Sequence, residues 1–216
     1  MELAIAVGLF VITHVVIARS ALKPLLIRRG GERLYLALYS VLSLVLLGWV
    51  IAALLRAPRL VLWSTPDWAY GFAIVMTAVG FILLGAGAAT PNPFSVSFKK
   101  TGYDPHHPGL IGWVRHPVLV GFGAWGFAHL PANGDVAALA VFGGFGAFSL
   151  IGGRALARRL RRRMGEEAWA QALPARGSFD KRAIIGGASG LVAWTGFLVA
   201  HPWLFGVDPA ALAGSR

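Results

Sequence analysis

The chain has 216 residues, of which 56% are hydrophobic and 13% charged, and it contains no cysteine. Because soluble domains carry about a quarter charged residues, this composition excludes an ordinary soluble protein. The lack of cysteine excludes disulfides and thiolate metal sites. The net charge is +11, and the basic residues lie between long uncharged stretches. This pattern indicates contact with anionic lipid headgroups and not with nucleic acid.

Six apolar segments follow one another along the chain, and each is expected to form a transmembrane helix. They cover residues 2–18, 34–55, 67–89, 117–131, 135–153 and 184–206. Crossing the hydrocarbon core takes about 20 apolar residues, so the first and fourth segments are short. The sequence predicts an all-α integral membrane protein, a bundle of about six transmembrane helices in one domain over residues 1–216.

The basic residues set the expected orientation. The loops after the first, third and fifth segments hold 17 of the 20 lysines and arginines, and only Arg56, Arg59 and Arg216 fall elsewhere. The positive-inside rule places these three loops in the cytoplasm and both termini outside. The first segment carries Glu2 and is followed by Arg19 where a cleavage site would need small residues, so it is expected to be a retained helix.

Two cytoplasmic loops and two glycine clusters have a distinct character. Residues 91–110 are rich in proline and are expected to be irregular. Residues 155–173, ALARRLRRRMGEEAWAQAL, have helical spacing and are expected to extend the fifth helix at the membrane interface. Glycines in 143–153 and 186–190 predict close helix packing.

Histidines inside the apolar segments are the candidate functional residues, because burying ionisable groups in a bilayer is costly. They are His14 in the first segment, His129 in the fourth and His201 near the outer end of the sixth. Loop residues His106 and His107 are adjacent and do not converge easily on one metal.

One face of the fourth segment suits a haem. Gly126, Trp125 and Phe122 precede His129 by three, four and seven positions, so they share its side of a helix. A flat space beside an imidazole suits haem, whose iron takes one or two axial histidines. The alternative is a histidine bonded to a neighbouring helix, with Gly126 permitting close packing. Both interpretations stay open on the residues alone.

The triplet Arg115-His116-Pro117 begins the same segment and needs a separate explanation. His116 precedes His129 by 13 positions, about 20 Å along a helix, so the two cannot bind one iron. A cationic Arg115 beside a proline-initiated helix predicts an anion site, for a haem propionate or a lipid phosphate.

Two motifs resemble the signatures of the NnrU family. The first is THVVIARSALKPLLIRRGGERLYLALYSVLSL (13–44), in which His14 and Ser20 are followed by GER-x-Y and LYS. The second is GLIGWVRHPVLVGFGAWGFAHLPANGD (109–135), in which RHP is followed by a tryptophan, AH and ANGD. The motifs occur in the expected order and cover about a quarter of the chain.

The resemblance implies a function. NnrU proteins are associated with nitrite and nitric oxide reduction in denitrifying bacteria, and the family is similar to 15-cis-ζ-carotene isomerase, a haem b membrane enzyme. By that similarity His14 and His129 are the haem ligands, and the protein lies in the bacterial inner membrane. A hydrophobic small-molecule substrate and a redox partner or homo-oligomer are also expected. Where the isomerase has a cysteine, this chain has Gly126, which excludes a thiolate ligand there.

Three alternatives remain. Helical rise separates His14 and His129 by about 10 Å in depth, which makes His201 the alternative partner of His129. The chain also resembles isoprenylcysteine-type methyltransferases, which bind S-adenosylmethionine. The shared features are the RHP triplet and a pair of glutamates after a basic helix, here Glu166 and Glu167. The third alternative is that the protein has no catalytic activity and serves as an assembly factor for a reductase.

Overall fold

A computed structural model describes residues 1–19, 22–99, 101–178 and 180–215. Ser20, Lys100 and Arg216, which enter the family motif or the charge count, lie outside the described residues. Within the described residues the chain forms helices and loops, with a single isolated β-bridge between Val61 and Asp135. The prediction of an all-α protein is confirmed.

The chain divides into two compact units. The first contains Met1–Val61 and Asp135–Ala137, and the second contains Leu62–Gly134 and Ala138–Arg216. The expectation of a single domain stays a prediction, and each unit is described by itself below.

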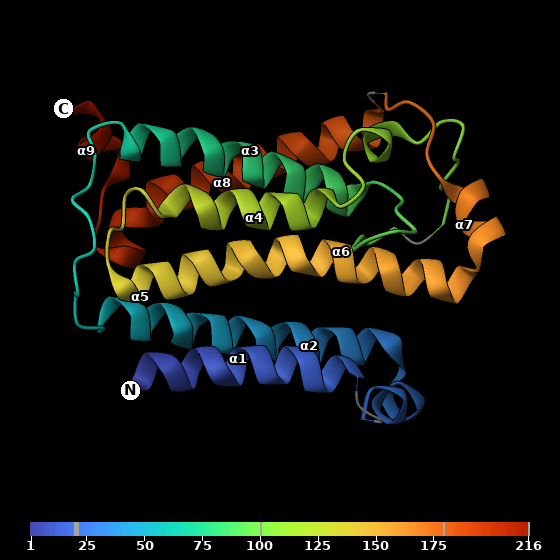
Figure 1. Cartoon of the computed structure of the whole chain (residues 1–216), viewed down its shortest axis with the longest axis horizontal. Coiled ribbons are helices and arrows are strands. Elements are labelled where there is room, and N and C mark those ends of the chain that lie inside the picture. Colours follow the sequence, from blue (N-terminus) through green and yellow to red (C-terminus); the bar gives the residue numbers. More distant parts are fainter. Residues whose placement is uncertain (20–21, 100, 179, 216) are drawn as a thin grey trace. The chain divides into compact units, whose positions relative to one another are not determined.

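The first unit is a helical hairpin. Helices α1 (Glu2–Arg19) and α2 (Leu22–Leu55) run antiparallel side by side (Figure 1). Helix α2 starts earlier than predicted, because two helical stretches join across a kink at Gly31 (φ 80°, ψ 162°). Glycine adopts this positive φ without a steric penalty.

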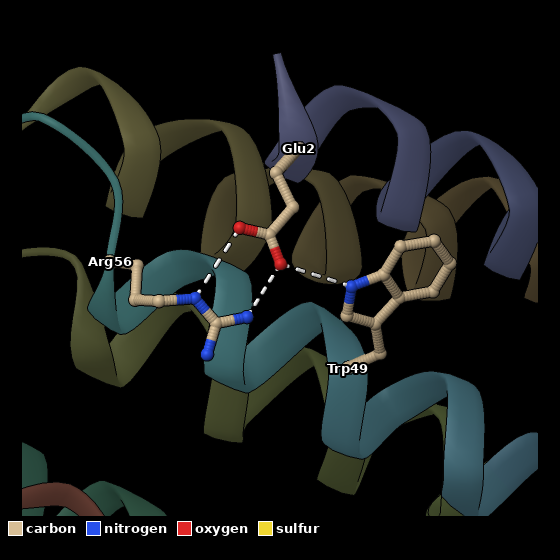
Figure 2. A network of polar contacts seen from close by, with 3 residues as sticks. All are labelled: Glu2, Trp49 and Arg56. Carbon is tan, nitrogen blue, oxygen red and sulfur yellow. Dashed lines mark hydrogen bonds and ion pairs between the residues drawn. The ribbon is translucent and has the colours of Figure 1, made fainter.

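A polar contact ties the open end of this hairpin, as Figure 2 shows. Nε and Nη2 of Arg56 donate to the Glu2 carboxylate at 3.3 and 2.5 Å, and Trp49 Nε1 donates to it at 3.2 Å. Glu2 and Arg56 are exposed, and Trp49 is half-buried. Exposed pairs of this kind stabilise a protein by about 1 kcal/mol or less in water.

The second unit contains four long helices. They are α3 (Ala69–Ala89), α4 (Pro117–His129), α6 (Gly144–Met164) and α8 (Lys181–Phe205). Helix α3 packs against both α4 and α8, and α4 packs in turn against α6 (Figure 1). A π-helical turn, Leu139–Gly143, leads directly into α6, and the short helix α5 (Val136–Ala138) that precedes it falls mostly in the first unit.

Glycines allow backbones to touch within the second unit. A Cβ on Gly186 of α8 would lie 2.5 Å from the carbonyl oxygen of Gly85 on α3, and a Cβ on Gly190 would overlap the Phe81 carbonyl. Gly80 and Gly121 meet in the same way between α3 and α4. The predicted role of the 186–190 glycines in close helix packing is confirmed.

Four helices of the described chain are long and apolar enough to cross a membrane. They are Lys23–Leu55, Ala69–Ala89, Val136–Met164 and Lys181–Phe205. Helix α4 has 13 residues and the apolar part of α1 covers Glu2–His14, so both are shorter than a full span. The structure supports a membrane protein with four such helices, and the number six stays a prediction.

The predicted helix over 155–173 is interrupted. Helix α6 ends at Met164, Gly165 adopts φ 84°, and α7 (Glu166–Ala172) follows in a new direction. Trp169 of α7 is buried against Phe94 and Ile111, so α7 covers the irregular loop that precedes α4. A 3₁₀ turn, Gly109–Gly112, and the C-terminal helix α9 (Pro209–Gly214) complete the described elements.

Candidate functional site

The histidines of the three apolar helices, His14 of α1, His129 of α4 and His201 of α8, share one hydrogen-bond arrangement. In each of them Nδ1 lies close to a backbone carbonyl oxygen. The distance is 2.7 Å from His14 to Phe10, 2.7 Å from His129 to Trp125, and 2.8 Å from His201 to Val207. A carbonyl oxygen only accepts, so Nδ1 carries the proton in each neutral ring and Nε2 keeps its lone pair. Metal-bound histidines are oriented by this kind of bond.

The helix itself produces the arrangement at two of these positions. Phe10 and Trp125 each precede their histidine by four residues, and helical side chains point back toward the preceding turn. The imidazole therefore reaches the carbonyl one turn earlier, and the local sequence alone sets its tautomer.

Aromatic rings hold His129 in place. Its ring stacks on Phe142 with centroids 4.6 Å apart and 14° between the planes, and it contacts Trp125 at 4.9 Å. Trp125 also meets Phe142 and Phe145 edge-on at 5.4 and 5.9 Å. The sequence analysis identified Trp125 and missed Phe142, which the π-helical turn brings to His129.

The other two residues of the predicted haem face behave differently. A Cβ on Gly126 would lie 2.8 Å from the Phe142 carbonyl oxygen and 3.0 Å from the Gly146 amide nitrogen. The space beside Gly126 is therefore filled by the backbone that leads into α6, as in the close-packing interpretation. Phe122 is 46% exposed and lies on the surface of the unit.

His14 has its own aromatic surroundings in the first unit. Its ring stacks on Phe10 with centroids 4.1 Å apart and meets Tyr39 of α2 at 5.5 Å. Tyr39 belongs to the LYS motif of the sequence, and that motif was the sequence feature that could have indicated its contact with His14. His129 and His201 belong to the second unit.

Arg115 and His116 lie at the opposite end of α4 from His129. The Arg115 guanidinium lies over the rings of Phe94 and Trp169, 5.6 and 5.7 Å from their centroids. These are cation–π contacts, and they hold the arginine beside the aromatic cluster below α7. Asn92 fixes the same turn, because its Nδ2 donates to the Arg115 carbonyl at 2.9 Å.

His116 is the residue immediately before α4. Its ring lies against Gly153 of α6, where a Cβ would be 3.5 Å from Cδ2. Nδ1 is buried and has no hydrogen-bond partner in the described part of the chain. Burial, with a smaller effect from the Arg115 charge, lowers the pKa of His116 below its ordinary value.

The two glutamates of the methyltransferase-like interpretation are engaged locally. Glu166 accepts hydrogen bonds from Arg161 at 2.9 and 2.5 Å, and Glu167 accepts one from Gln171 at 3.4 Å. Both carboxylates are exposed on α7. Their contacts are those of a solvated helix surface.

The donor set limits the kind of metal centre. Over the described ranges, no three His, Cys, Asp or Glu side chains come together to hold a bare metal ion. A haem has a different requirement, because the porphyrin supplies four ligands and the protein adds one or two. Single histidines with an available Nε2 fit that requirement.

Comparison with known proteins identifies the family. No curated protein and no solved structure matches the chain. A family model described as "NnrU protein" matches residues 2–209. Since the match covers nearly the whole chain and includes both motifs, the chain belongs to the NnrU family.

Proposed function

We propose that this NnrU protein binds haem b in the bacterial inner membrane, with His14 and His129 as the axial ligands. The supporting observation is the matched arrangement of the two rings, each with Nδ1 bonded to a carbonyl at 2.7 Å and Nε2 left for a metal. Residues that orient a ligating histidine in this way raise its basicity and fix its direction.

The surrounding side chains have distinct roles in this proposal. Trp125 and Phe142 hold the His129 ring, and Phe10 and Tyr39 hold that of His14. Gly126 acts by allowing close helix approach, and it supplies no ligand that could exchange with a histidine.

Arg115 serves the membrane surface in this proposal. It lies just before α4, at the opposite end of that helix from His129, and a lipid phosphate or a haem propionate is the anion that we propose for it. Arg115 is exposed and would meet the anionic headgroups of the cytoplasmic leaflet, whereas the His116 ring packs against Gly153 of α6. The asymmetry of the basic loops supports an external N-terminus.

The bound haem would supply one-electron or Lewis-acid chemistry. The chain would hold the group in an apolar environment and exclude water around it. Activity in nitrite or nitric oxide metabolism, or an isomerase-like reaction on a hydrophobic small molecule, is consistent with this arrangement. A redox partner or a second copy of the chain would deliver electrons.

Absorption spectra of the purified protein in mild detergent test the proposal. We expect a Soret band, with sharp α and β bands after dithionite reduction. His14→Ala and His129→Ala should each change the spectrum to a five-coordinate form or remove the haem. His116→Ala is the matched control, since it removes a histidine at the far end of α4.

The variants also separate the two possible partners of His129. If His201→Ala changes the spectrum and His14→Ala does not, His201 is the second ligand and the assignment of His14 is wrong. A protein that stays colourless when haem is supplied during expression would overturn the whole proposal.

A further inference from the structure

A pocket of about 240 Å³ lies in the second unit, away from the intramembrane histidines. Three parts of the chain line it: the end of α3 at Thr90–Pro91, the loop residues 102–104 with 107–108, and the start of α8 at residues 180–182. Thr90, Pro91 and Pro108 are buried and form its inner wall. The pocket opens among the basic loops, on the side where the sequence predicts the cytoplasm.

The pocket wall is fastened at several points. The Ala175 amide donates to the Pro105 carbonyl at 2.8 Å, and the Ser178 amide donates to the Gly109 carbonyl at 3.1 Å. The Tyr103 hydroxyl donates to the Ala172 carbonyl at 3.0 Å. The loop is therefore bound to the segment between α7 and α8, so the pocket has a defined wall.

Two cations in the lining are available to a ligand. Lys181 and Arg182 form no ion pair within the described residues. The Arg182 guanidinium lies over Gly102, where a Cβ would be 3.7 Å from Nη1, and Gly102 has a φ of +84°. An arginine held beside a bare backbone can present its nitrogens to a phosphate in a bidentate way.

Two carboxylates line the same pocket. Asp104 accepts from the His106 amide at 2.9 Å and from His107 Nδ1 at 3.0 Å. Asp180 accepts from the Ala183 amide at 2.8 Å and so caps α8. Each oxygen can accept a further hydrogen bond. With two cations and two carboxylates, the lining is balanced in charge and suits a ligand that carries both signs.

The size of the pocket limits the ligand. Sites that bury drug-sized molecules occupy about 300–1,000 Å³, so a pocket of 240 Å³ encloses only a headgroup-sized part of a ligand. This space matches a small phosphate ester with a short amino-alkyl group.

We propose that this pocket binds a zwitterionic phosphate ester of headgroup size. The phosphate lies against Arg182 and Lys181, and the ammonium lies between Asp104 and Asp180. A phospholipid headgroup and a free phosphoamine share this chemistry. The site is separate from the haem proposal and does not depend on it.

Calorimetry on the full chain in detergent tests this site, with phosphoethanolamine as the probe. We expect saturable binding, weakened at least tenfold by Arg182→Gln. Arg159→Gln is the matched control, because it removes the same charge from an exposed position of α6 outside the pocket. Circular dichroism and size-exclusion chromatography establish folding, and Lys181→Gln serves as a second variant if Arg182→Gln does not fold.

Glycerol phosphate, which lacks the ammonium, tests the role of the carboxylates. The intact protein should prefer phosphoethanolamine several-fold, and Asp104→Asn should reduce that preference. Equal binding of the two esters, no binding of either, or indifference to both cation variants would overturn the proposal. Displacement of the bound probe by phosphatidylethanolamine nanodiscs identifies the ligand as a lipid, and retention of the probe identifies a soluble phosphoamine.

Discussion

His129 and Phe142 stack almost face to face, with ring centroids 4.6 Å apart and planes 14° from parallel. Phe142 lies in the π-helical turn before α6, and His129 is the last residue of α4. The bond from Nδ1 to the Trp125 carbonyl holds one edge of the imidazole, and Phe142 covers one face. The direction of Nε2 is therefore set by two independent contacts.

Removing Phe142 should loosen His129. Phe142→Ala takes a ring from the α4–α6 contact, and comparable substitutions in protein cores cost about 3–5 kcal/mol. We expect a lower melting temperature and, on the haem proposal, weaker retention of haem in size-exclusion chromatography. Phe148→Ala is the control on α6, because Phe148 is 55% exposed. Equal effects of the two substitutions would contradict a specific role for the stacked ring.

The sequence predicted the helices well, because long apolar stretches in this composition have few alternatives to membrane helices. It did not indicate the breaks at Gly31 and Gly165, which lie in the basic stretches between those segments. Gly31 and Gly165 both adopt positive φ, yet other glycines in this chain lie in regular helix. At both positions a Cβ would meet nothing within 4 Å, so no close packing contact requires the break there, and no local sequence pattern marks it.

The candidate site was predictable where the contacts are local. His129 meets Trp125 through the four-residue spacing of a helix, and the sequence was sufficient for that pair. Phe142 and Tyr39 come from neighbouring helices, and their register against His129 and His14 depends on tertiary packing. Gly126 depends on tertiary packing in the same way. Its sequence context fits either a cofactor or a neighbouring helix, and the position of the Phe142 and Gly146 backbone beside it decides for the helix.

A second prediction concerns the glycine contact between α3 and α8. At Gly190 a Cβ would overlap the Phe81 carbonyl oxygen, whereas nothing lies within 4 Å of a Cβ at Gly196 on the same helix. Gly190→Ala should force the two helices apart and cost about 1–3 kcal/mol, the usual range for overpacking. Gly196→Ala should be neutral. Thermal unfolding in one detergent compares the two variants. Equal melting temperatures would show that α3 and α8 can separate at Gly190 without loss of stability, against the prediction.

A third prediction concerns Trp169 and the position of α7. Trp169 is 8% exposed and meets Phe94 edge-on at 5.3 Å. Trp169→Ala removes the side chain that attaches α7 to the loop before α4, at a local cost of about 3–5 kcal/mol. Limited trypsin digestion should then cut the arginine-rich segment around α7 faster. Trp203→Ala, at a position 79% exposed on α8, should leave the digestion rate unchanged.

The last prediction concerns pH and His116. The pKa of His116 in the folded protein is lowered from its ordinary value of 6.5 by burial and by the Arg115 charge. The unfolded chain therefore binds a proton more readily, and stability should fall as pH drops below 6.5.

His116→Phe tests this dependence. The phenyl ring fills a similar space without a buried unpaired nitrogen, whose desolvation costs about 1–3 kcal/mol. The variant should be at least as stable as the parent at pH 8. Between pH 7.5 and 5 it should lose less of its melting temperature than the parent does. An unchanged pH slope would mean that His116 binds protons equally in the folded and the unfolded chain, and the pH dependence would have to arise from another titratable group.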